Sequence, residues 1–181
     1  GEIIQHAGIT NMTVGPAHKM GGMNDRGKSI YHGRNLADYN VLAVTAACMA
    51  VRKEVFDKIG GFATELAVAY NDVDICFSLY ESGYWNVVRN DVILYHHESL
   101  SRGGDETGEK ALRLLREREI LYNRHPGLRG KDPFYSPHLV QERLDADFHV
   151  EYQYPHEDRN RLSVGTECSA LSRWKDKVTR K

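Results

Sequence analysis

The sequence predicts an α/β domain with a mixed sheet flanked by helices, and three observations support this fold class. The chain has 181 residues, of which 41% are hydrophobic, so it can fill one sizeable core. Residues 41–51 form a nearly unbroken apolar run, which is typical of a strand covered on both faces. Residues 72–82 carry apolar side chains at spacings of three and four, which predicts a helix with one face packed on the sheet.

The segments before residue 41 are predicted to be a short strand at residues 2–7 and a long loop at residues 8–35. The loop is rich in glycine and poor in aliphatic residues. Loops of this length are uncommon in compact domains, and they tend to be binding elements or disordered segments. Both alternatives stay open for residues 8–35 on the sequence alone.

The segments after residue 51 are predicted to alternate between helices and short strands. Val55, Phe56 and Ile59 share one helical face, and the pair Gly60-Gly61 should end that short helix. The remaining elements are expected to be strands at 84–88 and 92–96, a loop at 98–105 and a helix at 106–123.

The last of these helices and the end of the chain set the predicted domain boundary. Leu112, Leu115 and Ile120 would form the apolar stripe of the helix at 106–123, and Pro126 should end it. Beyond "DPFYSPHL" the chain turns polar. We therefore expect a folded part at 1–139 and a peripheral polar tail at 140–181.

Charge and cysteine content exclude several classes of partner. The chain has 24 basic and 25 acidic residues, a balance that indicates neither nucleic-acid binding nor strong attraction to membranes. The longest apolar run is shorter than the roughly 18 residues that a membrane span needs, so no transmembrane segment is expected. Cys48, Cys76 and Cys168 are predicted to be buried free thiols in a reducing compartment, which favours the cytoplasm.

The chain begins with "GEIIQHAG", which lacks an initiator Met and enters the predicted strand at once. A piece of a longer protein would begin this way. Removal of a start residue or a tag would give the same beginning. Both interpretations stay open at this point.

Three polar side chains stand where the helix at 72–82 begins. Asn71, Asp72 and Asp74 can cap the helix and interact favourably with its dipole. Alternatively, the long apolar segment before them can desolvate a carboxylate in part, which would make it a stronger general base. Capping and catalysis are thus the two hypotheses for these acids.

A second polar group follows the predicted strand at 92–96. His96 and His97 would point to opposite faces of that strand, so they cannot clamp one metal ion together. One of them can be an ordinary surface histidine. Alternatively, His96 with Ser101 and Arg102 of the next loop can bind a metal-diphosphate group, for which guanidinium is well shaped. The triplets at 72–74 and 145–147 are rejected as metal motifs, because the first opens a helix and the second lies in the tail.

Four sequence stretches, in this order and spacing, resemble one known family. They are "VTAACMAVRKEVFDKIGGF", "AVAYNDVDICFSLYESGYWNVV", "LYHHESLSRG" and "DPFYSP", and they cover about residues 40–137. The chain is similar there to the family 2 inverting glycosyltransferases of the GT-A fold, and among them to bacterial rhamnosyltransferase-like members. The match is to the C-terminal, acceptor-side half of that fold. The N-terminal nucleotide-binding half, with its acid-x-acid metal motif, is missing, which favours a truncated chain.

The resemblance implies a function and a role for each candidate residue. The parent enzyme would transfer a sugar from a nucleotide-sugar donor to a glycan acceptor, with Asp72 as the general base. Asn71, which stands where many members have Glu, and Asp74 would position the acceptor. His96 would help to hold Mg²⁺ or Mn²⁺, and Ser101 and Arg102 would bind the donor diphosphate.

The resemblance also implies the setting of the chain. The enzyme would work in the cytoplasm or at the inner face of the membrane, in polysaccharide biosynthesis. The isolated chain would be inactive, and its surface for the missing half would favour self-association. The alternative hypothesis is a non-catalytic module of the same fold that binds a glycan or a partner.

Overall fold

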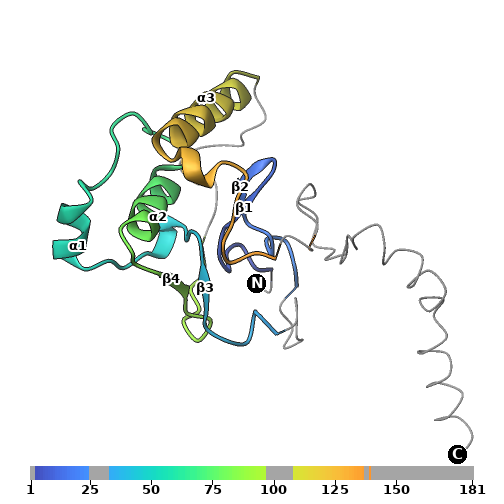
Figure 1. Cartoon of the computed structure of the whole chain (residues 1–181). Coiled ribbons are helices and arrows are strands. Elements are labelled where there is room, and N and C mark those ends of the chain that lie inside the picture. Colours follow the sequence, from blue (N-terminus) through green and yellow to red (C-terminus); the bar gives the residue numbers. More distant parts are fainter. Residues whose placement is uncertain (1–2, 25–32, 97–107, 137–138, 140–181) are drawn as a thin grey trace, which may run out of the picture. The chain divides into compact units, whose positions relative to one another are not determined.

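Short antiparallel strands and a few helices alternate along the chain in a mixed α/β arrangement (Figure 1). The computed structural model describes residues 3–24, 33–96, 108–136 and 139. All of these belong to one compact unit, Gly1–His149. The predicted tail at 140–181 lies outside the described residues, so the boundary at residue 139 stays a prediction.

The N-terminal part contains a hairpin of β1 (Thr10–Met12) and β2 (Gly15–Ala17), which pair antiparallel. The prediction of a loop throughout 8–35 is therefore wrong for this stretch, because Asn11 and Met12 are buried and anchor the hairpin in the fold. The strand predicted at 2–7 is also wrong. Its described residues form only an isolated bridge, between Ile3 and Asn24.

The second sheet pairs β3 (Tyr39–Val41) antiparallel with β4 (Asn86–Val88). The strand predicted at 41–51 is thus much too long. The chain leaves the sheet after Ala43, which bridges to Ile9, and then forms the 3₁₀ helix η1 (Ala46–Cys48).

The prediction for residues 84–96 is half confirmed. The first of its two strands is β4, with the expected position in the chain. The second, at 92–96, is not a strand in the structure, and its apolar side chains are exposed. An apolar run of that length identifies neither a pairing partner nor a covering layer, and the part of the chain that the structure describes provides neither for residues 92–96.

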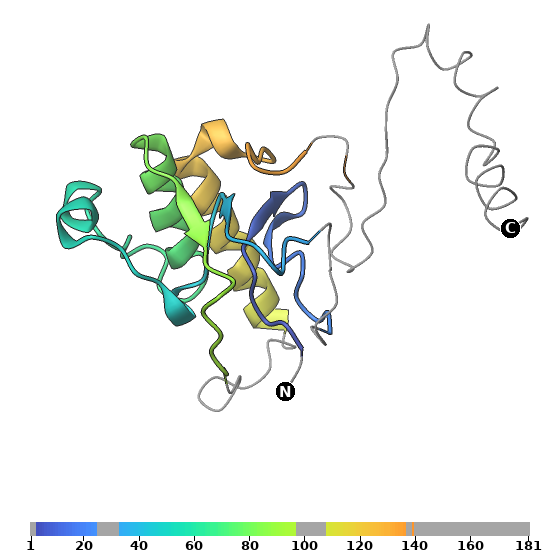
Figure 2. The same cartoon turned by 90° about the horizontal axis from the view of Figure 1, so that it is seen from below.

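Two helices in the middle of the chain confirm the sequence prediction. Helix α1 (Lys53–Lys58) is followed by Gly60 and Gly61, whose φ angles of 87° and 68° are the left-handed values expected at a helix end. Helix α2 (Asn71–Glu81) lies where its apolar stripe predicted it. It contacts β4 and forms the centre of the core (Figure 2).

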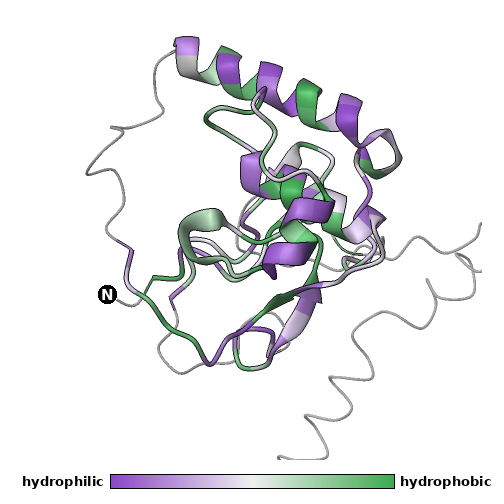
Figure 3. Ribbon diagram, turned by 90° about the vertical axis from the view of Figure 1, so that its left-hand side faces the viewer, coloured by the Kyte–Doolittle hydropathy of each residue, from purple (hydrophilic) through white to green (hydrophobic). Residues whose placement is uncertain are grey.

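The last helix, α3 (Gly108–Arg124), is also found as predicted, and it ends before Pro126, which opens the 3₁₀ helix η2 (Pro126–Leu128). Its buried face was predicted only in part, because Ile120 packs against the core as expected. Leu112 and Leu115 are exposed, whereas Leu121 and Tyr122 enter the core. Hydrophilic and hydrophobic segments alternate along α3 (Figure 3), so several stripes compete in the sequence and only the packing selects one.

The core is formed where α2, the end of α3 and the strand segments meet. Phe77 and Cys76 from α2, Leu42 after β3 and Leu121 from α3 are all fully buried in one cluster. This packing fixes the position of α2, whose first turn carries the candidate acids Asp72 and Asp74.

Both described cysteines are free thiols, as predicted, but only Cys76 is buried. Cys48 is exposed because the chain has already left the sheet at η1, so its predicted burial is wrong. Cys168 lies outside the described residues. Among the helices of the described part, none has the length and apolar character that crossing a membrane requires.

Candidate functional site

The first turn of α2 starts from a strained backbone position. Tyr70 has a φ of 59°, in the left-handed region that a bulky residue rarely adopts. The N–H of Asp74 donates to its carbonyl at 2.8 Å, so the turn is closed in spite of this conformation. Burial raises the pKa of the partly buried Tyr70. Strain of this kind costs on the order of 1–3 kcal/mol, and it is often found at functional sites.

Asp72 binds two backbone N–H groups with its two carboxylate oxygens. Oδ1 accepts from the N–H of Val73 at 2.9 Å, and Oδ2 accepts from the N–H of Ala46 in η1 at 3.0 Å. The N-cap position of α2 is Tyr70, and no side chain caps the helix there. Oδ1 of Asp72 instead accepts an N–H inside the first turn, and Oδ2 holds η1 against α2. A carboxylate has about four lone-pair positions, so Asp72 retains capacity for a further hydrogen bond. Asn71, its neighbour, accepts the N–H of Asp72 on Oδ1 at 2.8 Å.

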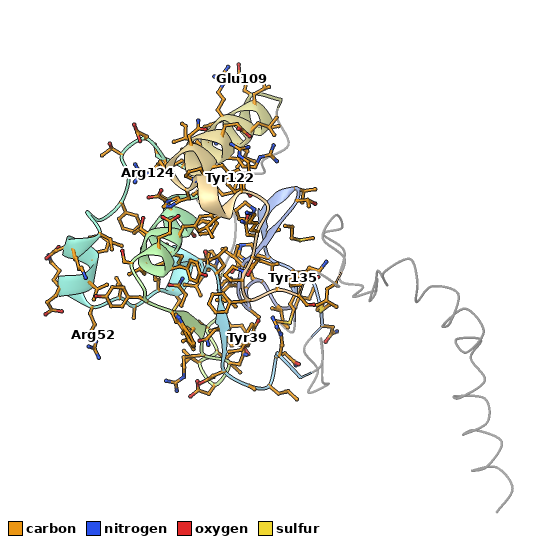
Figure 4. All side chains as sticks on the ribbon, viewed as in Figure 1. Tyr39, Arg52, Glu109, Tyr122, Arg124 and Tyr135 are labelled. Carbon is orange, nitrogen blue, oxygen red and sulfur yellow. The ribbon has the colours of Figure 1, made fainter. Side chains whose placement is uncertain are left out.

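Asp74 lies on the inner side of the same turn and is 1% exposed. Arg124 donates to it through Nε at 2.6 Å, and His125 Nε2 lies 2.9 Å from the same oxygen. His125 also contacts Glu81 through Nδ1 at 2.8 Å. Arg124 lies at the end of α3 that approaches α2 (Figure 4). The carboxylate of Asp74 therefore ties the first turn of α2 to the end of α3.

The hydrogen bonds of this cluster outweigh burial in setting its pKa values. Burial acts to raise the pKa of Asp74, but the hydrogen bonds from His125 and Arg124 leave it lowered. Burial acts to lower the pKa of His125, but its hydrogen bonds with Asp74 and Glu81 leave it raised. Both shifts favour the charged forms, so the cluster is a buried ion pair.

Three successive N–H groups after β3 donate to side chains instead of to a neighbouring strand. Val44 donates to Sγ of Cys76 at 3.4 Å, Thr45 to Nε2 of His6 at 3.4 Å, and Ala46 to Oδ2 of Asp72 at 3.0 Å. This turn thus connects the core, the N-terminal segment and the candidate base within three residues.

His96 lies in an open pocket, beside the N-terminal segment rather than after a strand. Its Nδ1 is 2.7 Å from Oε1 of Gln5, and an amide oxygen can only accept, so Nδ1 carries the proton. The pocket is lined by the following residues: Ile3, Ile4, Gln5, His18, Gly21, Gly22 and His96. His97, Ser101 and Arg102 lie outside the described residues, so their predicted positions are not tested.

His6 and His18 are functional candidates that the sequence prediction missed. Their Nδ1 atoms are 3.1 Å apart, and their rings pack edge to face. Burial, with a contribution from His18, lowers the pKa of His6 to about 4. The signal in the sequence was two histidines that flank the hairpin, in "QHAG" and "AHK", but no spacing rule connects them.

The described residues fit a divalent metal site only in part. Nδ1 of His96 contacts an oxygen, Oε1 of Gln5, and metal-ligating histidines usually make such a contact with the nitrogen that does not bind the metal. Among the described residues no group of three or more His, Cys, Asp and Glu could hold a metal ion. The remaining ligands for Mg²⁺ or Mn²⁺ would have to come from outside these residues, and the predicted metal stays a prediction.

Two known proteins are similar to the chain. "Uncharacterized protein y4gI" of Sinorhizobium fredii (strain NBRC 101917 / NGR234) is 39% identical over 150 residues, which cover 78% of this chain and 16% of that protein. "O-antigen biosynthesis protein RfbC" of Myxococcus xanthus is 33% identical over 164 residues, which cover 90% of this chain and 12% of that protein. The chain thus spans less than a fifth of either relative. No family model and no solved structure matches it.

Proposed function

We propose that the protein containing this chain acts in polysaccharide biosynthesis, as a glycosyltransferase. It would transfer a sugar from a nucleotide-diphosphate donor to a hydroxyl of a glycan acceptor, with inversion. Residues 1–139 would be the acceptor-side half of a GT-A domain, and the nucleotide-binding half would belong to the rest of the protein. The similarity to an O-antigen biosynthesis protein over 90% of the chain supports the broader statement.

The observation that carries the proposal is the placement of Asp72. Its carboxylate stands in the first turn of α2, and one oxygen is fixed by the N–H of Ala46. In the proposed reaction Asp72 takes the proton of the acceptor hydroxyl while that oxygen bonds to the anomeric carbon. The bond from this carbon to the diphosphate oxygen breaks, and its electron pair leaves with the diphosphate. Attack opposite the leaving group inverts the configuration.

The other candidate residues would support this displacement. Asp74 would act as a positioning residue, because its pairing with Arg124 and His125 holds the turn that carries Asp72. Asn71 would contact the acceptor. Ser101 and Arg102 would bind the donor diphosphate.

His96 would supply one ligand to Mg²⁺ or Mn²⁺. When bound, such a metal neutralises charge on a leaving diphosphate. The cytoplasm, or the inner face of the membrane, is the location at which we propose that the enzyme works.

A non-catalytic glycan-binding module is the second candidate function. Both oxygens of Asp72 accept backbone N–H groups, and Oδ1 of Asn71 accepts the N–H of Asp72, so these side chains have a structural role as well. In a module that binds a glycan without transferring a sugar, Asn71 and Asp72 would have only this structural role.

The substitution Asp72→Asn in the whole protein decides between the two functions. Asn keeps one acceptor oxygen but places an NH₂ group where the other carboxylate oxygen accepts a backbone N–H, so the free energy of unfolding should fall by about 1–3 kcal/mol and turnover is compared in the folded variant. Loss of a general base should lower turnover by roughly 10² to 10⁴-fold. The measurement is release of nucleoside diphosphate from a panel of nucleotide-sugars, with and without Mn²⁺.

Asp57→Asn is the matched control, because Asp57 is an exposed acid on α1 that pairs only with Lys53 among the contacts described. It should leave turnover unchanged. Near-normal turnover in the folded Asp72→Asn variant would show that Asp72 is not the general base and would favour a structural role for it.

A further inference from the structure

We propose that Glu117 of α3 is a positioning residue for the candidate base, because it holds the strained turn at Tyr70 and so fixes the orientation of the Asp72 carboxylate. That Asp72 acts as a base rests on the proposed function. The contact between α3 and the turn rests on the hydrogen bonds and ion pairs of the described residues.

Glu117 anchors the backbone directly before the strained residue. It is buried, with 6% of its surface exposed, and its Oε2 accepts the backbone N–H of Ala69, which precedes Tyr70. A buried carboxylate is costly unless it is paired and hydrogen-bonded. Nε of Arg113, one turn earlier on α3, lies 4.0 Å from Oε1 of Glu117 and offsets its charge. Glu117 thus holds the chain at the start of the strained turn.

Arg124 provides a second anchor on the same face of α3. It follows Glu117 by seven residues, which is about two helical turns, so the two side chains leave one face about 10 Å apart along the axis. Leu121 lies on this face between them and is fully buried in the core. Arg124 donates through Nε to Asp74 at 2.6 Å. The two anchors of α3 therefore hold the chain before and after the strained turn.

The backbone of Tyr70 needs such anchors to keep its conformation. Its φ of 59° is one that a bulky residue keeps only where the surrounding structure determines it. A turn without anchors would relax toward negative φ and would rotate the residues that follow. Asp72, two residues later, would then move relative to η1, where the N–H of Ala46 donates to its Oδ2 at 3.0 Å. The anchor at Glu117 is therefore coupled to the orientation of the carboxylate.

Two substitutions at residue 70 test the strain itself. Tyr70→Gly and Tyr70→Ala both remove the ring, but glycine adopts a positive φ readily and alanine does not. Urea unfolding of the 181-residue chain should show a higher midpoint for Tyr70→Gly than for Tyr70→Ala. The reverse order is normal at sites without a positive φ, and it would overturn the inference.

Nuclear magnetic resonance of the folded chain tests the coupling between the anchor and the base. Scalar couplings across the N–Cα bond report the φ of Tyr70, and the carboxyl ¹³C signal reports the surroundings of Asp72. Glu117→Leu removes the acceptor of the Ala69 N–H, so both observables should change. Glu117→Gln removes the charge but keeps an acceptor oxygen, so both should stay close to those of the unsubstituted chain.

Glu119→Leu is the matched control, because Glu119 is an exposed acid of the same helix that pairs with Arg129. It should change neither observable. Glu117→Asp is a milder variant, which keeps the charge but shortens the side chain, and it should shift both observables in the same direction as Glu117→Leu. Unchanged observables in Glu117→Asp, and in Glu117→Leu where it folds, would overturn the inference.

Turnover of the whole protein tests the positioning role. Glu117→Leu should lower kcat at least about tenfold and leave the KM for the nucleotide-sugar unchanged, because only the orientation of the base is lost. Glu117→Gln should retain most of the turnover. A merely structural role would lower the amount of folded enzyme but not the turnover of each folded molecule, and that result would contradict the inference.

Failure of this inference and failure of the proposed function give different results. Full turnover of the folded Asp72→Asn variant would exclude Asp72 as the base, whereas altered couplings at Tyr70 in Glu117→Leu would still support the anchor. Conversely, loss of turnover in Asp72→Asn together with normal turnover of folded Glu117→Leu would support the glycosyltransferase and overturn the positioning role of Glu117.

Discussion

Asp74 and His125 form a buried pair whose pKa values are shifted in opposite directions, so the pair loses its contribution to stability at both low and high pH. The pKa of Asp74 is lowered from 3.8, so its stabilisation is present above that value and is lost as the pH falls through the lower folded-state value. The pKa of His125 is raised from 6.5, so its stabilisation is present below 6.5 and is lost as the pH rises through the higher folded-state value. The contribution of the pair is therefore greatest between these two limits.

Replacing Asp74 with Asn should reveal this dependence. The variant leaves His125 and Arg124 without their shared carboxylate, and breaking such a buried pair costs about 3 kcal/mol or more. Urea unfolding of the chain should show the largest loss between pH 3.8 and 6.5 and smaller losses outside this range. Asp57→Asn, on exposed α1, is the control. A difference in stability that does not vary with pH would contradict the pairing.

Cys76 and Cys48 should differ strongly in reactivity. Burial raises the pKa of Cys76 to about 12 from an ordinary value of 9.0, which lowers its thiolate fraction by roughly 10³-fold, and its side chain is also inaccessible. Cys48 is exposed in η1. In a Cys168→Ser background, a disulfide reagent should modify one thiol rapidly in the native protein and the second only on unfolding. Equal rates for both thiols would contradict the buried position of Cys76.

At the scale of elements, the buried side chain of Asn11 anchors the hairpin β1–β2 through hydrogen bonds. Nδ2 of Asn11 donates to the carbonyls of Leu128 and Lys131, and Oδ1 accepts from the hydroxyl of Tyr122 at 2.6 Å. Its backbone N–H donates to Asp132 at 2.8 Å. One residue therefore connects the hairpin to the end of α3 and to the segment after η2.

Substituting Asn11→Ala should consequently destabilise the fold by about 3 kcal/mol, because buried carbonyls lose their donor. Asn123→Ala is the matched control, since Asn123 is exposed on α3. Thermal or urea unfolding gives the comparison. Equal effects of the two substitutions would show that Asn11 is not the anchor.

The sequence predicts well the elements that are determined by interactions between residues close together in the chain. Helix α2 follows from its own apolar stripe and from Gly83, so its position and the acids at its start were predicted correctly. The strand at 41–51 was predicted too long for a non-local reason. The N–H groups of residues 44–46 find their acceptors in Cys76, His6 and Asp72, between 26 and 39 residues away, and hydrophobic periodicity does not detect such pairings.

Within the candidate site, the residues set by local structure were predicted, and those brought together by distant segments were missed. Asn71 and Asp72 are found in the first turn because the position of the helix is visible in sequence, but the N-cap itself is Tyr70, which makes no side-chain cap hydrogen bond. His6 and His18 were missed because the hairpin between them, which brings them together, was taken for a loop. His96 was placed after a strand that the structure does not contain, but the pocket that it lines still includes a second histidine.

At the scale of the whole molecule, a run of apolar side chains lies uncovered after β4. Val92, Ile93, Leu94 and Tyr95 are between 54% and 75% exposed. Consecutive exposed apolar residues of this kind are typical of surfaces that a further element covers. In the proposed function the missing half of the domain would cover them, and in the isolated chain a second copy should do so.

Sedimentation velocity should therefore detect self-association of the isolated chain. Ile93→Lys together with Leu94→Lys should shift the chain to a monomer at the same concentration, because charged side chains oppose burial of the surface. Leu112→Lys is the control, since Leu112 is a similarly exposed apolar residue on α3. A chain that stays monomeric throughout would show that this surface does not drive association.

The hydrogen bond from Ala46 to Asp72 provides an observable for events at the candidate base. The amide proton of Ala46 senses the charge of the carboxylate that it contacts, so its chemical shift should move whenever Asp72 binds a proton or an acceptor hydroxyl. The amides of Thr45 and Val44 sense His6 and Cys76 in the same spectrum. Three neighbouring backbone signals can thus report separately on Asp72, on His6 and on Cys76 in the core, without any label attached to the protein.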